Sequence, residues 1–580
     1  MNKIVKIITI ILLPGLAFSQ STYAPINSDY YYLLDRYEIK NGSFSPTFHA
    51  SVKGYERKAI AEFIDSANLD SNKLSRSDQF NLTYLRNDNW EWSTKAQNDR
   101  KPILKNFYDK KSDLYNVHTK DFDFHLNPVM YFQYGSDKET GATAKLSGTT
   151  NYINTRGVEF RGMIDKKIGF YFFFTDNQMV VPGYAKQYID AHNAIPEQSF
   201  YKTYGANGKG YDFLTGRGYI TFNVTKHINV QLGRDRNFIG NGYRSLILSD
   251  FSGNYNFLKI NAKVWKINYM SLFAQMNASG QTLAADTYFP QKYFALHHLS
   301  YNVSKRFNIG VYEAMVFGPR DSTRKSYDWN YLTPVVPYLA VNQQLGSPDN
   351  AFLGFDYSWN FCRHFSWYGQ LVIDDMDITD LLKKDGFWGN KQALQTGLKY
   401  IDAFGVRNLD LQGELNVIKP YTYSHASFYT NYANYNLPLA DPMGANLKEF
   451  IGIARYQPLP RLSLTGKLFY VKYGADTLNP KNTSISNVYG TNDYGGDISK
   501  SYSTIAYSGY HHYGNKIGQG IATTMVMLSF TATYQIAHNM FIDFSQTLRK
   551  VDSAYKPYNA NSSVTSIAFR WNIPKRLFEF

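Results

Sequence analysis

Alternation of apolar with polar or small residues at every second position is the strongest structural constraint in this sequence. It runs from about residue 120 to the end. In residues 409–417, for example, leucine and valine alternate with aspartate, glutamine, glutamate and asparagine, and residues 258–264 and 526–534 follow the same pattern. Because successive side chains of a β-strand point to opposite faces, these segments predict strands with one apolar and one polar face.

The connections between these segments are alternately short and long. Short turns are expected near residues 165–167, 225–227, 265–266, 304–306, 363–364, 404–407, 458–461 and 537–539. Long polar stretches rich in Tyr, Gly and Asn fall between them, notably near 177–215, 318–350, 419–448 and 473–523. We expect eighteen strands, near 122–134, 154–164, 168–176, 216–224, 228–234, 257–264, 267–276, 293–302, 307–317, 351–360, 365–374, 392–401, 408–418, 449–456, 462–472, 524–536, 540–549 and 564–573.

This layout predicts an all-β transmembrane barrel of about 18 antiparallel strands, with short periplasmic turns, long outer loops, an apolar outer band and a polar interior. Hydrocarbon cannot satisfy backbone N–H and C=O groups, so only a closed sheet is stable there. The 49 Tyr, 40 Phe and 8 Trp residues suit aromatic girdles. A mean hydropathy of -0.40 excludes a polytopic helical membrane protein. A soluble all-β protein is the alternative.

The first residues predict export. Lys3 and Lys6 precede an apolar run at 7–13, and Ala17-Phe18-Ser19 suits a signal peptidase, so residues 1–19 are expected to be a signal peptide. The expected location is the cell outer membrane of a Gram-negative bacterium, reached through the periplasm. The last predicted strand continues to a terminal aromatic, so we expect the barrel-assembly machinery as a partner through a C-terminal strand ending at Phe580.

Residues 20–118 have a different pattern, and the barrel is expected to comprise 119–580. Helix-like patterning over Arg57–Ser66 and over 75–86, with Ser75 or Ser77 as cap, predicts a small, partly helical periplasmic plug segment. Its aromatic residues need burial, which favours packing under or into the barrel mouth over a flexible linker. These residues are Phe44, Phe48, Tyr55, Phe63, Trp90 and Trp92.

Residues 233–250 form the most distinctive candidate site. Two interpretations are open. Its glycines allow a folded-back outer loop, or its arginines face the lumen or mouth and bind an anionic sugar through bidentate contacts. The second interpretation predicts a glycan-binding site formed by Arg234, Asp235, Arg236, Asn241 and Arg244. No helix with the spacing of a phosphate-binding loop follows.

Other chemistry-bearing residues predict neither catalysis nor metal binding. Glu313 and Glu414 are expected to be lumen-facing carboxylates that pair with lumen arginines, because nothing in the sequence brings them together as a glycosidase pair would require. Asp374, Asp375 and Asp377 lack calcium-loop spacing. The pairs His297-His298 and His511-His512 place rings on opposite sides of a strand. No Gly-x-Ser-x-Gly elbow is present. We therefore expect no enzyme activity, no metal and no cofactor.

The positive charge indicates anionic partners. Removal of Lys3 and Lys6 with the signal lowers the formal charge from +14 to +12. No nucleic-acid-binding module is recognisable, so nucleic acid is not expected. Lysine and arginine instead suit lipopolysaccharide, anionic glycans, a selective lumen or ordinary membrane-interface positions. The single Cys362 excludes an internal disulfide.

Several stretches resemble the capsule-assembly Wzi family of outer-membrane proteins, and more closely its relatives from gliding bacteria. They are Gly233-Arg234, Gly240 and Gly242, 245–249, Glu313, 346–350, 399–404 and 419–425. The resemblance spans roughly 120–580. It implies an eighteen-stranded barrel with helices on the periplasmic side and a non-enzymatic role in holding or assembling extracellular polysaccharide.

Three functions follow as hypotheses. The first is binding, attachment or assembly of capsular or extracellular polysaccharide, in support of adhesion or gliding motility, and it predicts a plugged lumen. The second is a diffusion channel (porin) for anionic or sugar solutes, which an open barrel of this size would form. The third, a lipid or glycan hydrolase, requires a nucleophile and base in contact. We favour the first.

Overall fold

The computed structural model describes residues 20–26, 28–67, 69, 74–98, 108, 110–144, 146, 150–205, 208–279, 288–319, 328–476, 493–502 and 512–580. The predicted signal peptide and His511 lie outside this part of the chain. No helix in the described ranges is long and apolar enough to cross a membrane.

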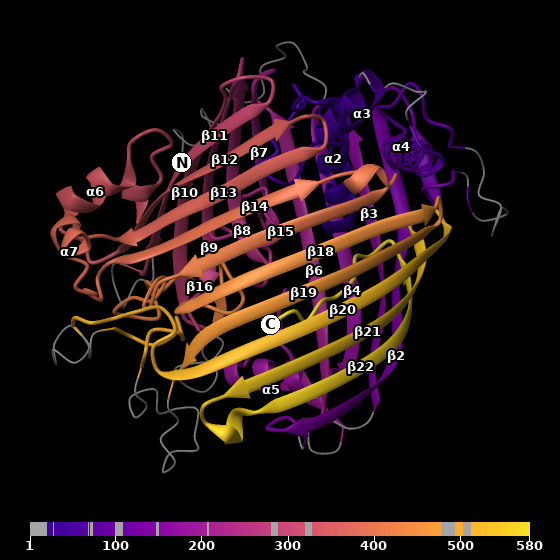
Figure 1. The fold of residues 1–580 in the computed structure, drawn as a ribbon. Coiled ribbons are helices and arrows are strands. Elements are labelled where there is room, and N and C mark those ends of the chain that lie inside the picture. The colour runs from indigo at the N-terminus through magenta and orange to yellow at the C-terminus, as the bar shows by residue number, and fades with distance from the viewer. Residues whose placement is uncertain are drawn as a thin grey trace.

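Within these ranges the chain forms a closed antiparallel barrel of eighteen strands (Figure 1). The strands are β2 (Phe122–Gly141), β3 (Thr150–Ile164), β4 (Ile168–Val180), β6 (Gly210–Asn223), β7 (Ile228–Asp235), β8 (Tyr255–Val264), β9 (Ile267–Asn277), β10 (Gln291–Asn302), β11 (Phe307–Phe317), β12 (Asn350–Phe361), β13 (Phe365–Asp375), β14 (Lys391–Tyr400), β15 (Leu409–Ile418), β18 (Leu447–Leu459), β19 (Leu462–Ala475), β20 (Ile521–Ala537), β21 (Met540–Ser553) and β22 (Ala560–Trp571). The barrel closes where β22 pairs with β2, from Met130 opposite Trp571 to Gly141 opposite Ala560.

All eighteen predicted strands are confirmed, and the main difference is their length. Strand β2, for example, continues to Gly141, seven residues beyond its predicted end at 134. Two short strands, β1 (Tyr115–His118) and β5 (Lys202–Tyr204), pair with β2 and β6, and a small hairpin of β16 (Ala433–Asn434) and β17 (Leu437–Pro438) lies apart. The outer ends of the longer strands are polar, so they lack the alternation of apolar and polar residues from which the strands were predicted.

The two faces of the wall have the predicted polarity. On β15, Leu415 is 42% exposed on the outer surface, whereas its neighbour Glu414 is buried in the lumen. Leu394, Leu528 and Ile567 continue the exposed apolar band on other strands. A closed wall with an apolar outer band is the structure that hydrocarbon stabilises. The chain therefore has the architecture of an outer-membrane barrel.

Short turns lie at one end of the barrel and long connections at the other. In bacterial outer-membrane barrels the short turns face the periplasm. The periplasmic end is at the upper right of Figure 1, where α3 and α4 lie, and the outer end is at the lower left.

Three helices of the N-terminal segment occupy the periplasmic end (Figure 1): α2 (Ser28–Asn41), α3 (Arg57–Ser66) and α4 (Arg76–Asp88). The predictions of α3 and α4 are confirmed, and Ser75 caps α4 through a reciprocal capping box with Asp78. Helix α2 was missed because its apolar and aromatic residues follow no single stripe. The shared core of the three helices contains Leu34, Ile60, Phe63, Leu82 and Leu85. Of the six aromatic residues that needed burial, Trp90 and Trp92 stay partly exposed.

The C-terminal residues correct one prediction. The last strand ends at Trp571 and not at Phe580, because Asn572 adopts a left-handed conformation (φ 54°) and Pro574 follows. Residues 572–580 turn back into the lumen, where Figure 1 places the C-terminus among the strands. Phe580 is 2% exposed, and its ring lies 4.0 Å from that of Tyr188, at a tilt of 37°. Tyr188 belongs to α5 (Gly183–His192), a helix of an outer loop. A terminal aromatic is thus not presented at a strand end.

Candidate functional site

Protein segments fill the lumen. The β7–β8 connection, residues 236–254, folds inward, and its Leu246, Ile247 and Leu248 are completely buried. From the β15–β18 connection, the hydroxyls of Tyr423 and Tyr432 donate to the carbonyls of Leu246 (2.7 Å) and Ile247 (2.5 Å). From the periplasmic side, Val52 forms a backbone bridge to Ile239. The N-terminal segment, two outer loops and the C-terminal tail therefore meet inside the barrel.

Glu414 fastens the 236–254 loop to the wall. Its carboxylate accepts hydrogen bonds from the backbone N–H groups of Tyr243 (2.6 Å) and Arg244 (3.0 Å) and from the Tyr368 hydroxyl (2.8 Å). A side chain at Gly242 would meet the Glu414 carboxylate at 2.7 Å, so glycine is required for this approach. Glu414 faces the lumen as predicted. It binds the backbone of an arginine-containing loop and not an arginine side chain.

The five predicted site residues do not form one site. Arg234 faces outward, on the same side of β7 as the exposed Leu232, and its Nη1 lies 3.3 Å from Asn256 Oδ1. The expectation that Arg234 faces the lumen or mouth is wrong, because Asn229 and Gln231 set the inward positions and period two puts residue 234 on the other side. Asp235 accepts from the backbone N–H of Arg236.

The other three predicted residues are buried in the folded-back loop. Arg236 lies 3.2 Å from Glu197 and donates to the carbonyl of Asp250 at 2.7 Å. Arg244 Nη2 lies 3.2 Å from Glu449 and 2.6 Å from the carbonyl of Glu579. Asn241 is also buried. These contacts fit the loop interpretation, and glycan binding by the five residues stays a prediction.

Arg236 and Arg244 line an internal cavity of about 180 Å³. A second cavity of about 190 Å³ lies nearer the periplasm, between α2 and the wall. The two cavities share a boundary made by Tyr32 of α2, Arg455 of β18, and Pro574 and Lys575 of the tail. The Arg455 guanidinium stacks over the Tyr32 ring at 4.4 Å. The two cavities therefore adjoin at helix α2 and the tail.

A pocket of about 250 Å³ lies on the outer face and was not predicted. It is formed by the β13–β14, β15–β18 and β19–β20 connections, and contains Phe387, Trp388, Lys384, Lys419, Lys516 and Asn515. The loops are joined across it, because Asn515 Nδ2 donates to the carbonyl of Gly386 at 3.0 Å. Aromatic rings, cations and amides share this concave surface with one carboxylate, Asp380, which pairs with Lys383 at 3.0 Å. The surface suits a ligand with both apolar faces and anionic groups. The only sequence signal was the Tyr/Gly/Asn-rich composition of the loops.

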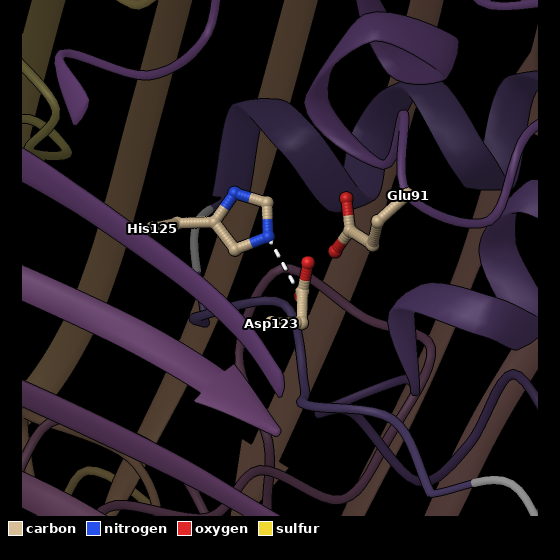
Figure 2. Close-up of side chains that lie close together, drawn as sticks. All are labelled: Glu91, Asp123 and His125. Carbon is tan, nitrogen blue, oxygen red and sulfur yellow. Dashed lines mark hydrogen bonds and ion pairs between the residues drawn. The ribbon is translucent and has the colours of Figure 1, made fainter. Parts of the chain in front are cut away.

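Glu91, Asp123 and His125 form a cluster at the periplasmic end (Figure 2) with donor atoms within 4.8 Å of one another. His125 Nε2 lies 2.9 Å from Asp123, and its Nδ1 lies 3.0 Å from Asp113. Glu91 pairs with Arg161 of β3. The charges are thus balanced by protein groups, and the cluster joins the N-terminal segment to the wall. That the protein holds no metal stays a prediction.

The remaining candidate residues have structural roles. His298 faces the lumen, where its Nε2 lies 2.6 Å from Asp356, and His297 faces outward, so the pair lies on opposite sides as predicted. Glu313 also faces outward, so its predicted lumen position is wrong. It lies on the same side of β11 as Ile309 and the exposed Val311, so it is a polar residue on the apolar face. Asp374 pairs with Lys391 at 3.0 Å, and Asp377 caps helix α7 (Ile378–Lys383).

Glu38 of α2 gives the plug a pH dependence. Burial raises the pKa of its carboxyl from 4.5 to about 8, although the Ser45 N–H donates to it at 2.7 Å. Between pH 4.5 and about pH 8, the Glu38 carboxyl is therefore protonated in the folded state and ionised in the unfolded state. Stability is expected to fall by about 1.4 kcal/mol for each pH unit as pH rises through this window. Hydrogen exchange of α2 at about pH 5 and pH 8 checks this, and Glu38→Gln should remove the slope.

No protein-family model matches the sequence, and no curated protein does. Among solved structures, Wzi of Escherichia coli is described as an outer membrane protein involved in group 1 capsule assembly and a carbohydrate-binding β-barrel. It aligns over 96% of this chain and 100% of its own with a TM-score of 0.54 and 13% identity. The fold is that of Wzi. OprD and OccK8 (OprE) of Pseudomonas aeruginosa align over 77% and 76% of this chain, and 94% and 97% of their own, with TM-scores of 0.39 and 0.40 and 8% identity each.

The fold that the sequence resemblance implied is therefore confirmed, including the eighteen strands and the helices at the periplasmic end. The Wzi-like barrel, its closed wall and its apolar band agree with a location in the outer membrane. At this identity the likeness to Wzi concerns the fold, so the function is argued from this chain's own residues.

Proposed function

We propose that this Wzi-like barrel is a non-enzymatic surface protein that binds, attaches or helps assemble capsular or extracellular polysaccharide. The observation that supports it most is the filled lumen. Because protein segments occupy the lumen, ligands from outside would meet the outer loops and not an open channel. The described carbohydrate binding of Wzi, which shares the fold, agrees with this role. Adhesion or gliding motility is the process that such binding would serve.

The outer pocket is the proposed contact site. A sugar ring presents apolar C–H faces that an aromatic ring can cover, and hydroxyl edges that amides can bind. Trp388 and Phe387 supply the rings, and the Asn515 amide holds the loops together beside them through its bond to the Gly386 carbonyl. Lys384 and Lys516 are exposed cations beside them, which favours an acidic saccharide.

Glycan affinity of the purified protein tests the site. With alginate oligomers as the acidic probe and dextran as the neutral one, Trp388→Ala is expected to weaken alginate binding about tenfold, which corresponds to about 1.4 kcal/mol. Lys516→Gln should reduce the preference for alginate over dextran. Trp265→Ala, in an exposed periplasmic turn, is the matched control and should leave both affinities unchanged. Equal affinities for all variants would refute the proposal that this pocket binds the glycan.

Two further measurements test the function itself. A deletion strain is expected to retain less polysaccharide on its surface and to shed more than its parent. In planar bilayers the protein should carry little current, whereas large steady currents would favour the diffusion channel.

Arg236→Gln and Arg244→Gln test the site that was predicted from the sequence. If these two variants weaken alginate binding and Trp388→Ala does not, the binding site lies in the lumen and not in the outer pocket.

The other partners are proposals on general grounds. Lipid and lipopolysaccharide would surround the apolar band and the basic outer surface. Barrel-assembly machinery would recognise the last strand, β22, in a form in which the tail has not yet entered the lumen.

A further inference from the structure

One outer connection descends along the outside of the barrel. Residues 328–349, here named the strap, lead to β12 and include the 3-10 helix η3 (Trp329–Tyr331) and the helix α6 (Tyr338–Leu345). Figure 1 shows α6 beyond the wall, and it contacts β11. Tyr331 and Tyr338 are completely buried against outward-facing residues of the wall, which are Phe273, Tyr293, Ala295, Met315 and Phe317.

Polar side chains of the wall lie beneath the strap and bind it. Glu313 of β11 accepts a hydrogen bond from the backbone N–H of Leu339 at 2.6 Å. His297 of β10 lies 3.0 Å from the carbonyl of Thr333 through Nε2, and its ring stacks on Tyr338 at 4.0 Å. Ionisable side chains that face hydrocarbon are costly unless they are paired. The strap provides the partners that lipid cannot.

The depth of these contacts places the strap beside the hydrocarbon. Strands β9 to β12 have only 11 or 12 residues each, about the length that a tilted strand needs to cross. Glu313 lies four residues from the outer end of β11 at Phe317, which is about 13 Å along the strand. Below it, Val311 and Leu299 are again exposed apolar residues. The strap therefore covers the outer half of the membrane-crossing wall.

Except for the exposed Gln343 and Gln344 near the end of α6, the outer surface of the strap is compatible with lipid. Residues 329–348 contain no Asp, Glu, Lys or Arg, although 19% of the whole chain is charged. Three of its apolar side chains point away from the wall: Trp329 is 73% exposed, Val335 79% and Val336 46%. The strap buries the wall residues beneath it, so in this region these three side chains form the exposed apolar surface in place of the wall.

We infer that the strap is embedded in the outer leaflet and that its partner is the acyl chains of the surrounding lipid. Irregular backbone is stable at this depth only where protein covers it. The Leu339 N–H and the Thr333 carbonyl meet this condition through Glu313 and His297. The strap thus replaces strand side chains as the lipid-facing surface over β9 to β11.

A single fluorophore tests the inference. In a Cys362→Ser background, which removes the one native thiol, Val335→Cys is labelled with an environment-sensitive dye and the full chain is reconstituted into vesicles of brominated phospholipid. We expect quenching equal to that at Leu394→Cys, a position 51% exposed in the apolar band. Lys516→Cys, in an outer loop, should stay unquenched.

Trp329→Cys is the second reporter and should behave like Val335→Cys. Quenching at both no greater than at Lys516→Cys, with rapid reaction of unlabelled Val335→Cys with a water-soluble thiol reagent, would overturn the proposal. Disulfide-linked dimers through Val335→Cys without lipid quenching would overturn it in favour of a second copy of the chain.

Discussion

Replacement of Arg36 by methionine is expected to destabilise docking of the N-terminal helices by about 3–5 kcal/mol. The Arg36 guanidinium is 2% exposed and pairs with Asp78 of α4 (3.1 Å), with Asp402 in the β14–β15 turn (2.6 Å) and with Asp410 of β15. Without it, three carboxylates stay buried, and Lys40 pairs with only two of them, Asp78 and Asp402. Limited proteolysis of residues 20–98 and the thermal midpoint would measure the effect.

The pKa of Asp402 reports the same interaction. Burial raises it, but Arg36 and Lys40 outweigh burial and lower the pKa of the carboxyl to about 2. The variant should move this pKa upward. Arg156→Gln is the control, because the Arg156–Asp176 pair is 57% and 42% exposed and its loss should cost no more than about 0.5 kcal/mol. Equal thermal shifts for the two variants would contradict the prediction.

Replacement of Glu414 by alanine is expected to release the 236–254 loop from the lumen. Two backbone N–H groups and the Tyr368 hydroxyl would lose their acceptor. An unsatisfied buried donor costs about 1–3 kcal/mol, so the three donors together correspond to about 3–9 kcal/mol. Trypsin should then cleave after Arg236 and Arg244, which are buried in the native protein.

Glu414→Gln retains one acceptor oxygen and should give an intermediate rate of cleavage. Glu62→Ala, at an exposed position of α3, controls for the loss of a carboxylate and should leave the loop protected. A Glu414→Ala protein with unchanged cleavage and an unchanged urea midpoint would show that the hydrogen bonds from Tyr423 and Tyr432 hold the loop without Glu414.

The barrel was predictable because each strand obeys a local rule. Period two fixes which residues face lipid, and Leu415 and Glu414 follow it without knowledge of their neighbours. Helices α3 and α4 were predictable from a stripe and a cap. Helix α2 has its aromatic residues on several sides, since it packs both against its sister helices and within the barrel.

The site was less predictable because it depends on where long loops fold. Arg244 meets Glu449 and the carbonyl of Glu579, more than 200 residues away, and nothing local indicates either partner. Glu313 and Arg234 were misplaced for a different reason: an outward polar residue is the exception that the period-two rule for barrels does not anticipate. At Glu313 the strap explains the exception.

Residues 572–580 add contacts inside the closed barrel. These residues lie inside the barrel, and the strand that precedes them, β22, closes this barrel by pairing with β2. Arg549 of β21 donates a hydrogen bond to the Phe580 carbonyl at 2.9 Å, so docking of this peptide adds a contact to the strand next to the seam. A bulky cargo fused after Phe580, which is 2% exposed, is therefore expected to displace the tail from the lumen and to loosen this part of the barrel.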